Sequence, residues 1–145
     1  MPGMGSAFVT ALRVHQEIYV RSHGVVGHRL LLGMRTLVLH TTGAKSGVRR
    51  SNALVYAPDK GRYLVVPSNG GANRHPGWFH NLRKEPEVDV WIGVQRKRAR
   101  ASWVMPGEPD FERLWKLCNI ANRGQFDQYR TKTARPIPVV VLTPL

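Results

Sequence analysis

The stretch that decides the fold is RSNALVYAPDKGRYLVVP, residues 50–67. It contains two runs rich in β-forming residues, 50–57 and 62–67, on either side of the turn sequence Pro-Asp-Lys-Gly at 58–61. Two such runs separated by a short turn predict a β-hairpin. A hairpin in the middle of the chain indicates an antiparallel arrangement of strands.

The remaining elements extend this pattern along the chain. Glycine, proline and the spacing of apolar residues predict further strands at 35–41, 88–92, 95–104 and 138–142 and helices at 6–21, 78–84, 109–119 and 125–131. Short strands joined mainly by hairpins favour an antiparallel sheet or a closed barrel, mainly β with flanking α helices. We find no repeat or linker, and expect one domain over 1–145, with the N-terminal helix within 1–21 and the barrel with its helices at 35–145.

The charge balance narrows the choice of partner. The chain has 22 Lys and Arg against 9 Asp and Glu, a formal net charge of +13. Such a field attracts nucleic acid, an anionic membrane surface or an acidic cofactor. One cysteine, Cys118, lies in a helical apolar pattern and indicates a packing role. The single cysteine, the missing signal peptide and the lack of a bilayer-spanning apolar run predict a cytoplasmic protein, with membrane contact of the N-terminal helix as a secondary prediction.

A basic turn follows the strand at 35–41. Its sequence, Thr41-Thr-Gly-Ala-Lys-Ser-Gly-Val-Arg-Arg50, is not a phosphate-binding loop of Walker type, because the first glycine is missing and a strand follows. Backbone amides of a glycine turn, together with Lys45 and Arg50, nevertheless form a suitable cradle for an anion. From the residues alone, an exposed, solvated hairpin loop is an equal alternative.

A second motif spans residues 67–82, PSNGGANRHPGWFHNL. Adjacent glycines let a backbone approach a flat ligand closely, and Trp78 stands at the start of a short helix, an electropositive position. Ser68 and Asn81 offer hydrogen bonds to polar ring edges. The alternative is a surface loop with Trp78 anchored in the core. No cysteine pair or carboxylate stands at ligand spacing from the histidines, so we predict no metal site.

Read together, these motifs resemble a known family. Thr41-Thr-Gly-x-Lys-Ser-Gly-x-x-Arg50, Ser68-x-Gly-Gly-x-x-x-His-Pro-x-Trp-x-His-Asn-Leu82 and Tyr129-x-x-Lys-Thr-x-Arg-x-Ile-Pro-Val-Val-Val-Leu142 follow one another as in the deazaflavin-dependent nitroreductases and F420H2-dependent quinone reductases. The resemblance implies a split β-barrel of Greek-key type, similar to FMN-binding barrels. It also implies coenzyme F420, a deazaflavin with a phosphate and an oligoglutamate tail.

The resemblance assigns residues to the two parts of this cofactor. By similarity, the phosphate and tail are held by Lys45, Ser46 and Arg50. The positions that line the deazaflavin ring are Ser68, Gly70, Gly71, Pro76, Trp78 and Asn81. The implied activity is hydride transfer from reduced F420 to a small organic acceptor, namely a quinone, an activated C=C bond such as an unsaturated lactone, or a nitroaromatic compound.

Tyr129 is the candidate catalytic residue, one that orients or protonates the reduced product. Family members present tyrosines three residues apart near the acceptor; here that register reads Arg123, Phe126 and Tyr129, so nitroimidazole activation does not transfer. We expect a monomer or weak dimer that does not bind nucleic acid. Two alternatives remain, an FMN-binding split-barrel protein and a basic nucleic-acid-binding module. The second lacks aromatic residues interleaved with its cations.

Overall fold

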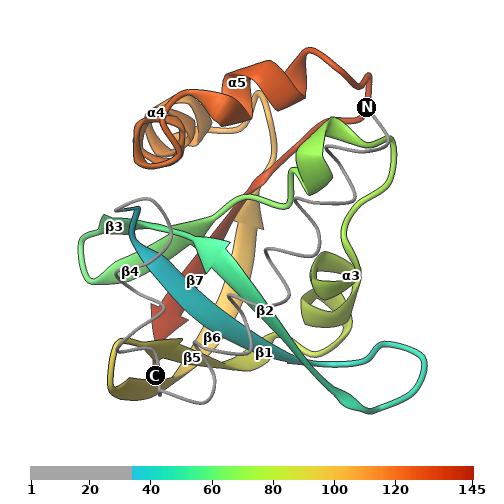
Figure 1. Ribbon diagram of the computed structural model, residues 1–145, viewed down its shortest axis with the longest axis vertical. Coiled ribbons are helices and arrows are strands. Elements are labelled where there is room, and N and C mark those ends of the chain that lie inside the picture. Colours follow the sequence, from blue (N-terminus) through green and yellow to red (C-terminus); the bar gives the residue numbers. More distant parts are fainter. Residues whose placement is uncertain (1–33) are drawn as a thin grey trace.

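The computed structural model describes residues 34–145, so the predicted N-terminal helix lies outside the described residues and the prediction of one domain over 1–145 stays a prediction. In chain order the elements are β1 (Thr36–Thr42), β2 (Arg49–Val55), β3 (Ala57–Asp59), β4 (Arg62–Val65), the 3-10 helix η1 (Asn69–Gly71), α3 (Gly77–Lys84), β5 (Glu87–Ile92), β6 (Gln95–Val104), α4 (Phe111–Ala121), α5 (Gln125–Arg130) and β7 (Val139–Pro144). The described strands form one antiparallel sheet in the order β2-β1-β5-β6-β7-β4-β3 (Figure 1).

The sheet is curled, because its two end strands are neighbours in the chain. Only Tyr56 separates β2 from β3, although these strands stand at opposite ends of the strand order. Tyr56 is buried, and its amide donates to the Arg35 carbonyl at 3.0 Å. The prediction of one strand over 50–57 was therefore wrong: at Tyr56 the chain leaves β1 and begins to pair with β4. The hairpin turn at 58–61 is confirmed between β3 and β4.

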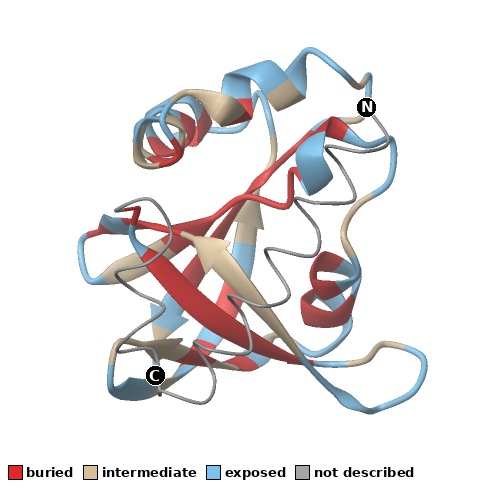
Figure 2. Cartoon of the chain, in the orientation of Figure 1, coloured by how far each residue is buried: buried red, intermediate tan, exposed pale blue. Residues whose placement is uncertain are grey.

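The inside of the curl holds the first of two apolar clusters. Alternate residues of β1, β5, β6 and β7 face inward, and one helix, α3, contributes Trp78, Phe79 and Leu82 to the same cluster. These side chains are almost entirely buried. Figure 2 shows α3 with a buried face turned toward the sheet. The helix is thereby fixed at one side of the barrel, and the segments before and after it are placed there too.

The second cluster lies between the outer face of the sheet and the pair α4 and α5. Phe111, Leu114 and Trp115 of α4 pack with Phe126 of α5 against β3, β4 and β7. In β7, Val140 and Leu142 belong to the inner cluster while Val139 and Val141 belong to this outer one, which explains its uninterrupted apolar run. Cys118 is buried here, and burial raises the pKa of its thiol to about 12, so its predicted packing role is confirmed.

An ion network fastens α4 to the β3–β4 hairpin. The buried carboxylate of Asp59 accepts hydrogen bonds from Arg113 of α4 at 2.8 and 3.0 Å and pairs with Arg62. The two guanidinium groups, first that of Arg113, hold the pKa of Asp59 well below its ordinary value. The helix begins at Phe111, after Asp110 in a left-handed conformation with φ 72°, so the predicted start at residue 109 was two residues early.

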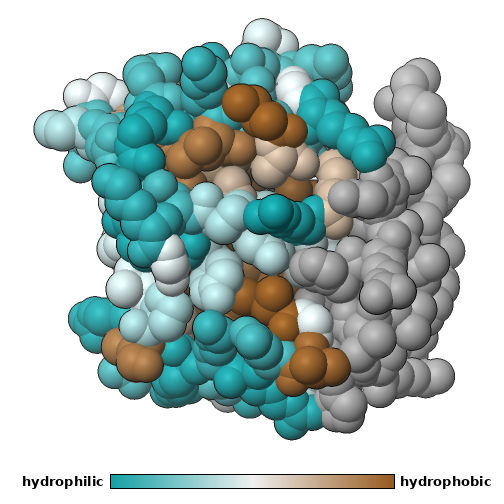
Figure 3. Space-filling view, turned by 90° about the vertical axis from the view of Figure 1, so that its left-hand side faces the viewer, coloured by the Kyte–Doolittle hydropathy of each residue, from teal (hydrophilic) through white to brown (hydrophobic). Residues whose placement is uncertain are grey.

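The side of the molecule that lies on the left in Figure 1 faces the viewer in Figure 3, and its described part is mostly hydrophilic. Figure 3 shows apolar residues there in separate patches rather than one continuous area, within the part of that face that is described. Among residues 34–145, no helix is both long enough and apolar enough to cross a membrane.

Candidate functional site

The basic turn between β1 and β2 is built on two glycines. The Gly43 amide donates to the Val48 carbonyl at 2.8 Å, and the Gly47 amide donates to the Gly43 carbonyl at 2.9 Å. Gly47 has a φ of 71°, and a Cβ on Gly43 would lie 2.6 Å from Oγ of Ser46. That same oxygen accepts a hydrogen bond from the Val48 amide at 3.1 Å. The Ser46 hydroxyl oxygen therefore helps to hold the shape of the turn.

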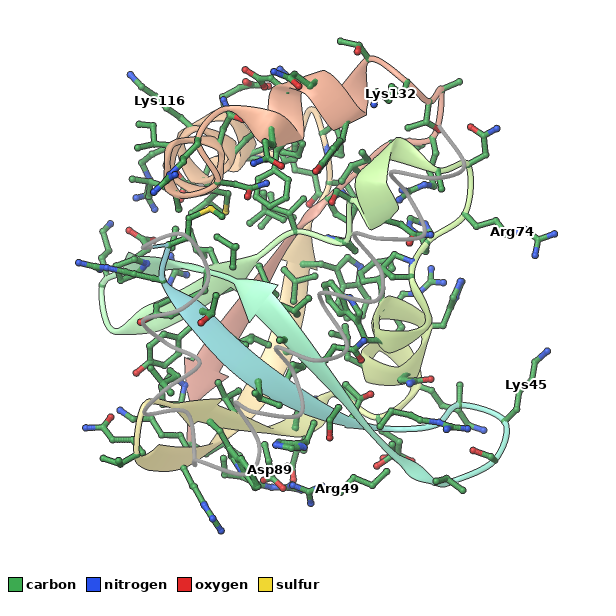
Figure 4. All side chains as sticks on the ribbon, in the orientation of Figure 1. Lys45, Arg49, Arg74, Asp89, Lys116 and Lys132 are labelled. Carbon is green, nitrogen blue, oxygen red and sulfur yellow. The ribbon has the colours of Figure 1, made fainter. Side chains whose placement is uncertain are left out.

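Two of the turn's cations, Lys45 and Arg50, are exposed, and their side chains make no hydrogen bond or ion pair with another residue of 34–145. Figure 4 shows Lys45 extending away from the turn. The neighbouring Arg49 differs, because it pairs with Asp89 at 3.2 Å. Within the described part of the chain, no carboxylate therefore pairs with either of the two predicted anion ligands.

Helix α3 holds this turn in place through its polar side chains. Asn81 donates from Nδ2 to Oγ1 of Thr41 at 3.1 Å and accepts from the Ala44 amide at 2.9 Å. Lys84 donates to the Ala44 carbonyl at 2.6 Å. Arg50 is paired with Thr41 in the sheet register, so its side chain leaves β2 on the face that α3 covers. Asn81, predicted at the ring, is buried and anchors the basic turn.

The glycine loop, residues 67–75, contains two glycines with opposite surroundings. Gly70 has a φ of 64°, and apart from its neighbours in the chain no heavy atom of residues 34–145 lies within 4 Å of the place that a Cβ would occupy. Gly71 has a φ of 87°, is buried, and a Cβ there would lie 2.7 Å from the Tyr129 carbonyl oxygen and 3.0 Å from Cβ of Lys132. Ser68 precedes them and is buried. The loop therefore presents Gly70 outward and packs Gly71 against the end of α5.

Trp78 and Pro76 stand at the start of α3. The Pro76 carbonyl accepts the Phe79 amide at 3.1 Å. The Trp78 side chain is only 5% exposed and belongs to the inner apolar cluster. It is thus the core anchor that the sequence left open as an alternative, and it fixes where the helix begins. In Figure 4, Arg74 of the glycine loop and Lys45 of the basic turn project from the same side of the molecule, above and below α3.

The Tyr129 side chain lies on α5, the helix that packs against η1. Its hydroxyl donates to Oε1 of Gln125 at 2.8 Å. The ring is half-buried, and this burial raises the pKa of the phenol above its ordinary value, so the group remains protonated at neutral pH. The structure therefore brings the backbone of Tyr129 to the glycine loop, while the hydroxyl proton of Tyr129 is bonded to Gln125.

One residue of this region was missed from the sequence. Arg135, six residues after Tyr129, points its guanidinium into the glycine loop and donates to the Pro67 and Ser68 carbonyls at 3.2 and 2.8 Å. Its place in the C-terminal motif was the available signal. The motif alone did not indicate a contact with residues more than sixty positions earlier.

A polar cavity of about 430 Å³ opens at the end of β1, beside β5 and β6. None of the predicted site residues lines it. His40 at its wall bonds Oγ of Ser51 at 2.7 Å, and burial, followed by the charge of Arg49, lowers its pKa to about 4. Two of the cavity's arginines pair with Asp89: Arg98 lies 3.1 Å from that carboxylate, and Arg49, labelled beside Asp89 in Figure 4, lies 3.2 Å from it. We assign this cavity no ligand.

Comparisons with known proteins agree with the sequence motifs and the fold. A family model described as F420H(2)-dependent quinone reductase matches residues 11–144. A protein of Mycobacterium tuberculosis (strain ATCC 25618 / H37Rv), named F420H(2)-dependent quinone reductase Rv1261c, is 45% identical over 135 residues, which are 93% of this chain and 91% of that protein. A solved structure of an F420-H2 dependent reductase, FDR-A, is 36% identical with a TM-score of 0.65 and covers 74% of this chain and 92% of that chain. Another solved structure, described as a domain-swapped dimer, is 32% identical with a TM-score of 0.68 and covers 92% of this chain and 98% of that chain. The predicted resemblance and the split-barrel fold are confirmed.

Proposed function

The chain belongs to the F420H(2)-dependent quinone reductase family, and from this premise we propose the residues that carry out its reaction. It is an oxidoreductase that transfers a hydride from reduced coenzyme F420 to a quinone-type acceptor. The deazaflavin supplies the hydride, because carbon at the flavin N5 position disfavours one-electron chemistry. The protein supplies binding, orientation and exclusion of water.

The observation that carries the site proposal is the unneutralised charge of the basic turn. F420 bears a phosphate and several carboxylates, and Lys45 and Arg50 are exposed cations without a described carboxylate partner. Charge-assisted hydrogen bonds from such groups to phosphate or carboxylate are short and strong. We therefore place the phosphate and tail at this turn, with Ser46 and Asn81 holding its backbone in shape.

The ring is placed at the glycine loop. Gly70 has open space on its outer side, and with no Cβ its backbone can come close to a flat ring. Ser68 and Gly71 set the course of the loop, and Pro76 and Trp78 fix the start of α3 below it. This division gives five of the six predicted ring residues one of two roles, close contact at the loop tip or support from beneath. The sixth, Asn81, holds the basic turn instead.

The acceptor is placed on the α5 side of the ring. Tyr129 stays protonated, and its hydroxyl can exchange the bond to Gln125 for one to an acceptor oxygen on which charge develops. A phenol in this position donates a hydrogen bond, or a proton, to the reduced quinone. Lactones and nitroaromatic compounds stay predictions as further acceptors.

The same comparisons bear on the two alternative functions, binding of FMN or of nucleic acid, and on the oligomeric state. They do not support FMN as the cofactor or contact with a membrane. The net charge of +13 would attract nucleic acid as well as an acidic cofactor, and we propose the acidic cofactor because of the family. The solved relative described as a domain-swapped dimer supports a weak dimer at most, so a monomer or weak dimer remains our proposal. A cytoplasmic location is proposed on the single cysteine and the family.

The function is tested by titrating the protein with F420 and with FMN while following tryptophan fluorescence. We expect tighter binding of F420, and oxidation of its reduced form only when a short-chain quinone is added. Buffer with quinone but without protein is the control for direct oxidation. Binding of FMN as tight as that of F420, with turnover of reduced FMN, would overturn the assignment.

A further inference from the structure

We infer that Arg135 is a positioning residue: its guanidinium holds the glycine loop in the shape that receives the cofactor ring. This inference rests on the proposed function, because the proposed ring site is that loop. Arg135 does not itself touch the reacting atoms. It lies on the segment between α5 and β7, and it is half-buried beneath the loop.

The guanidinium contacts both ends of the loop at once. Its Nη1 donates to the Pro67 carbonyl at 3.2 Å and to Nδ1 of His75 at 2.8 Å, while Nη2 donates to the Ser68 carbonyl at 2.8 Å. Its Nε donates to the Ala72 carbonyl at 3.1 Å. A planar fork of five N–H groups can satisfy four acceptors in different directions, whereas a lysine ammonium is a point donor. Arg135 therefore clamps residues that lie at the start, middle and end of the loop.

The loop has a shape that needs such a clamp. Three consecutive residues, Asn69, Gly70 and Gly71, have φ values of 48°, 64° and 87°, in the left-handed region. Three hydrogen bonds within the loop support it: the Gly71 amide donates to the Ser68 carbonyl at 2.9 Å, the Ala72 amide to the Asn69 carbonyl at 3.1 Å, and Nδ2 of Asn69 to the Arg74 carbonyl at 3.0 Å. Glycine adopts this region at no steric cost and is the least restricted residue, so a loop with two adjacent glycines has many other conformations open to it unless outside contacts hold it. From outside the loop, Arg135 makes four hydrogen bonds to it.

The segment that carries Arg135 follows the loop along its length. The Thr133 hydroxyl donates to Oδ1 of Asn73 at 2.8 Å, and the oxygen of the same hydroxyl accepts from the Arg135 amide at 3.0 Å. Gly71 packs so closely on the Tyr129 carbonyl that no side chain fits between them. The same stretch of chain thus joins the loop at Gly71, at Asn73 and through the guanidinium, with Tyr129 at its beginning.

The bond to His75 has a consequence that can be observed separately. Because an arginine only donates, Nδ1 of His75 must be the acceptor, so its ring proton is on Nε2. Burial, followed by the charge of Arg135, lowers the pKa of His75, which keeps the ring neutral. The ring also packs on Phe79 of α3 at a centroid distance of 4.7 Å. Arg135 therefore fixes one histidine tautomer at the junction of loop and helix.

A clamp of this kind acts on binding rather than on the chemical step. A loop held in its binding conformation loses less entropy when the ligand arrives, and removing the clamp weakens affinity without removing a contact to the ligand. At saturating cofactor the loop is held by the ligand itself. Loss of Arg135 is therefore expected to raise Kd and KM for reduced F420 and to leave kcat nearly unchanged.

The test compares Arg135→Met, Arg135→Lys and a control, Arg100→Met, which removes an exposed arginine of β6. Hydrogen exchange of the Gly71 and Ala72 amides is measured without cofactor, followed by the Kd for F420 and by KM and kcat with a quinone. In the methionine variant we expect about tenfold faster exchange or more, and a Kd raised by about 10- to 100-fold. The lysine variant is expected between it and wild type, and the control is expected to match wild type.

The outcomes separate this inference from the proposed function. If wild-type protein does not bind F420, the function is wrong, and the exchange rates still decide whether Arg135 holds the loop. Wild-type exchange rates and Kd in the methionine variant would overturn the inference. So would a lower melting temperature with unchanged KM, because that result describes a structural role only. If the methionine variant does not fold, the lysine variant decides by the same two measurements. Nitrogen chemical shifts of the His75 ring are expected to move toward a mixture of tautomers in both Arg135 variants.

Discussion

The adjacent glycines of the glycine loop offer a sharp experiment, because the same substitution meets different surroundings at each. Gly71→Ala places a Cβ 2.7 Å from the Tyr129 carbonyl oxygen and 3.0 Å from Cβ of Lys132, at a φ of 87°. Gly70→Ala places a Cβ in open space at a φ of 64°. Comparing the two variants separates backbone strain from the contact with the end of α5.

The expected magnitudes follow from these surroundings. A left-handed conformation costs a residue with a Cβ about 1–2 kcal/mol, and this cost applies to both variants. At Gly71 the collision with backbone atoms adds about 1–3 kcal/mol, because neither the carbonyl nor Lys132 Cβ can rotate away. We therefore expect a loss of about 1–2 kcal/mol for Gly70→Ala and about 2–5 kcal/mol for Gly71→Ala in the free energy of unfolding.

Urea denaturation at pH 7 measures the stability, and fluorescence titration with F420 measures the binding. Gly70→Ala is expected to weaken F420 binding with the smaller loss of stability, because its Cβ projects where we place the ring. Gly71→Ala is expected to lose more stability. Equal losses of stability in the two variants would refute the tight packing of the glycine loop on α5, and unchanged F420 affinity in Gly70→Ala would remove Gly70 from the ring site.

Three further predictions concern the basic turn, the phenol and the ion network. Lys45→Ala and Arg50→Ala are each expected to weaken F420 binding by about 1.5–3 kcal/mol, and a higher salt concentration is expected to weaken wild-type binding. Lys116→Ala, on the distant helix α4, is the matched control. Titrations in which all three variants bind F420 equally would exclude the basic turn as the binding site of the phosphate and tail. Tyr129→Phe is expected to lower turnover with a quinone by about 10²-fold, with Kd and melting temperature nearly unchanged; full activity in a less stable variant would contradict this. Asp59→Asn is expected to cost about 1–3 kcal/mol at pH 7. Because its arginine partners lower the pKa of Asp59, its contribution to the free energy of unfolding is present at a pH above the ordinary pKa of 3.8 and is lost as the pH falls below that value. The stabilities of variant and wild type are therefore expected to converge in acid. A difference in stability that stays constant with pH would contradict the ion network around Asp59.

The sequence by itself determined the features that depend on neighbouring residues. The turn at 58–61, the strand at 138–142 and the helix at 78–84 follow from local turn residues and periodicity, and each is found within a few residues of its predicted place. The three motifs and their order were sufficient to identify the family, because a motif is a pattern of residues along the chain and needs no knowledge of the fold. The basic turn with its cations was also predicted from neighbouring residues, because Gly43 and Gly47 indicate where the chain turns.

Only the tertiary structure decided which distant groups meet. The break at Tyr56 depends on β1 and β4, strands that stand far apart in the sheet, and a run of β-forming residues does not reveal a change of partner. Asn81 holds the basic turn, and Trp78 is anchored in the core rather than exposed to a ligand. Arg135 bonds a loop more than sixty residues earlier. A polar side chain can satisfy its hydrogen bonds with any group that folding brings near, so its partner is set by three-dimensional packing rather than by sequence position.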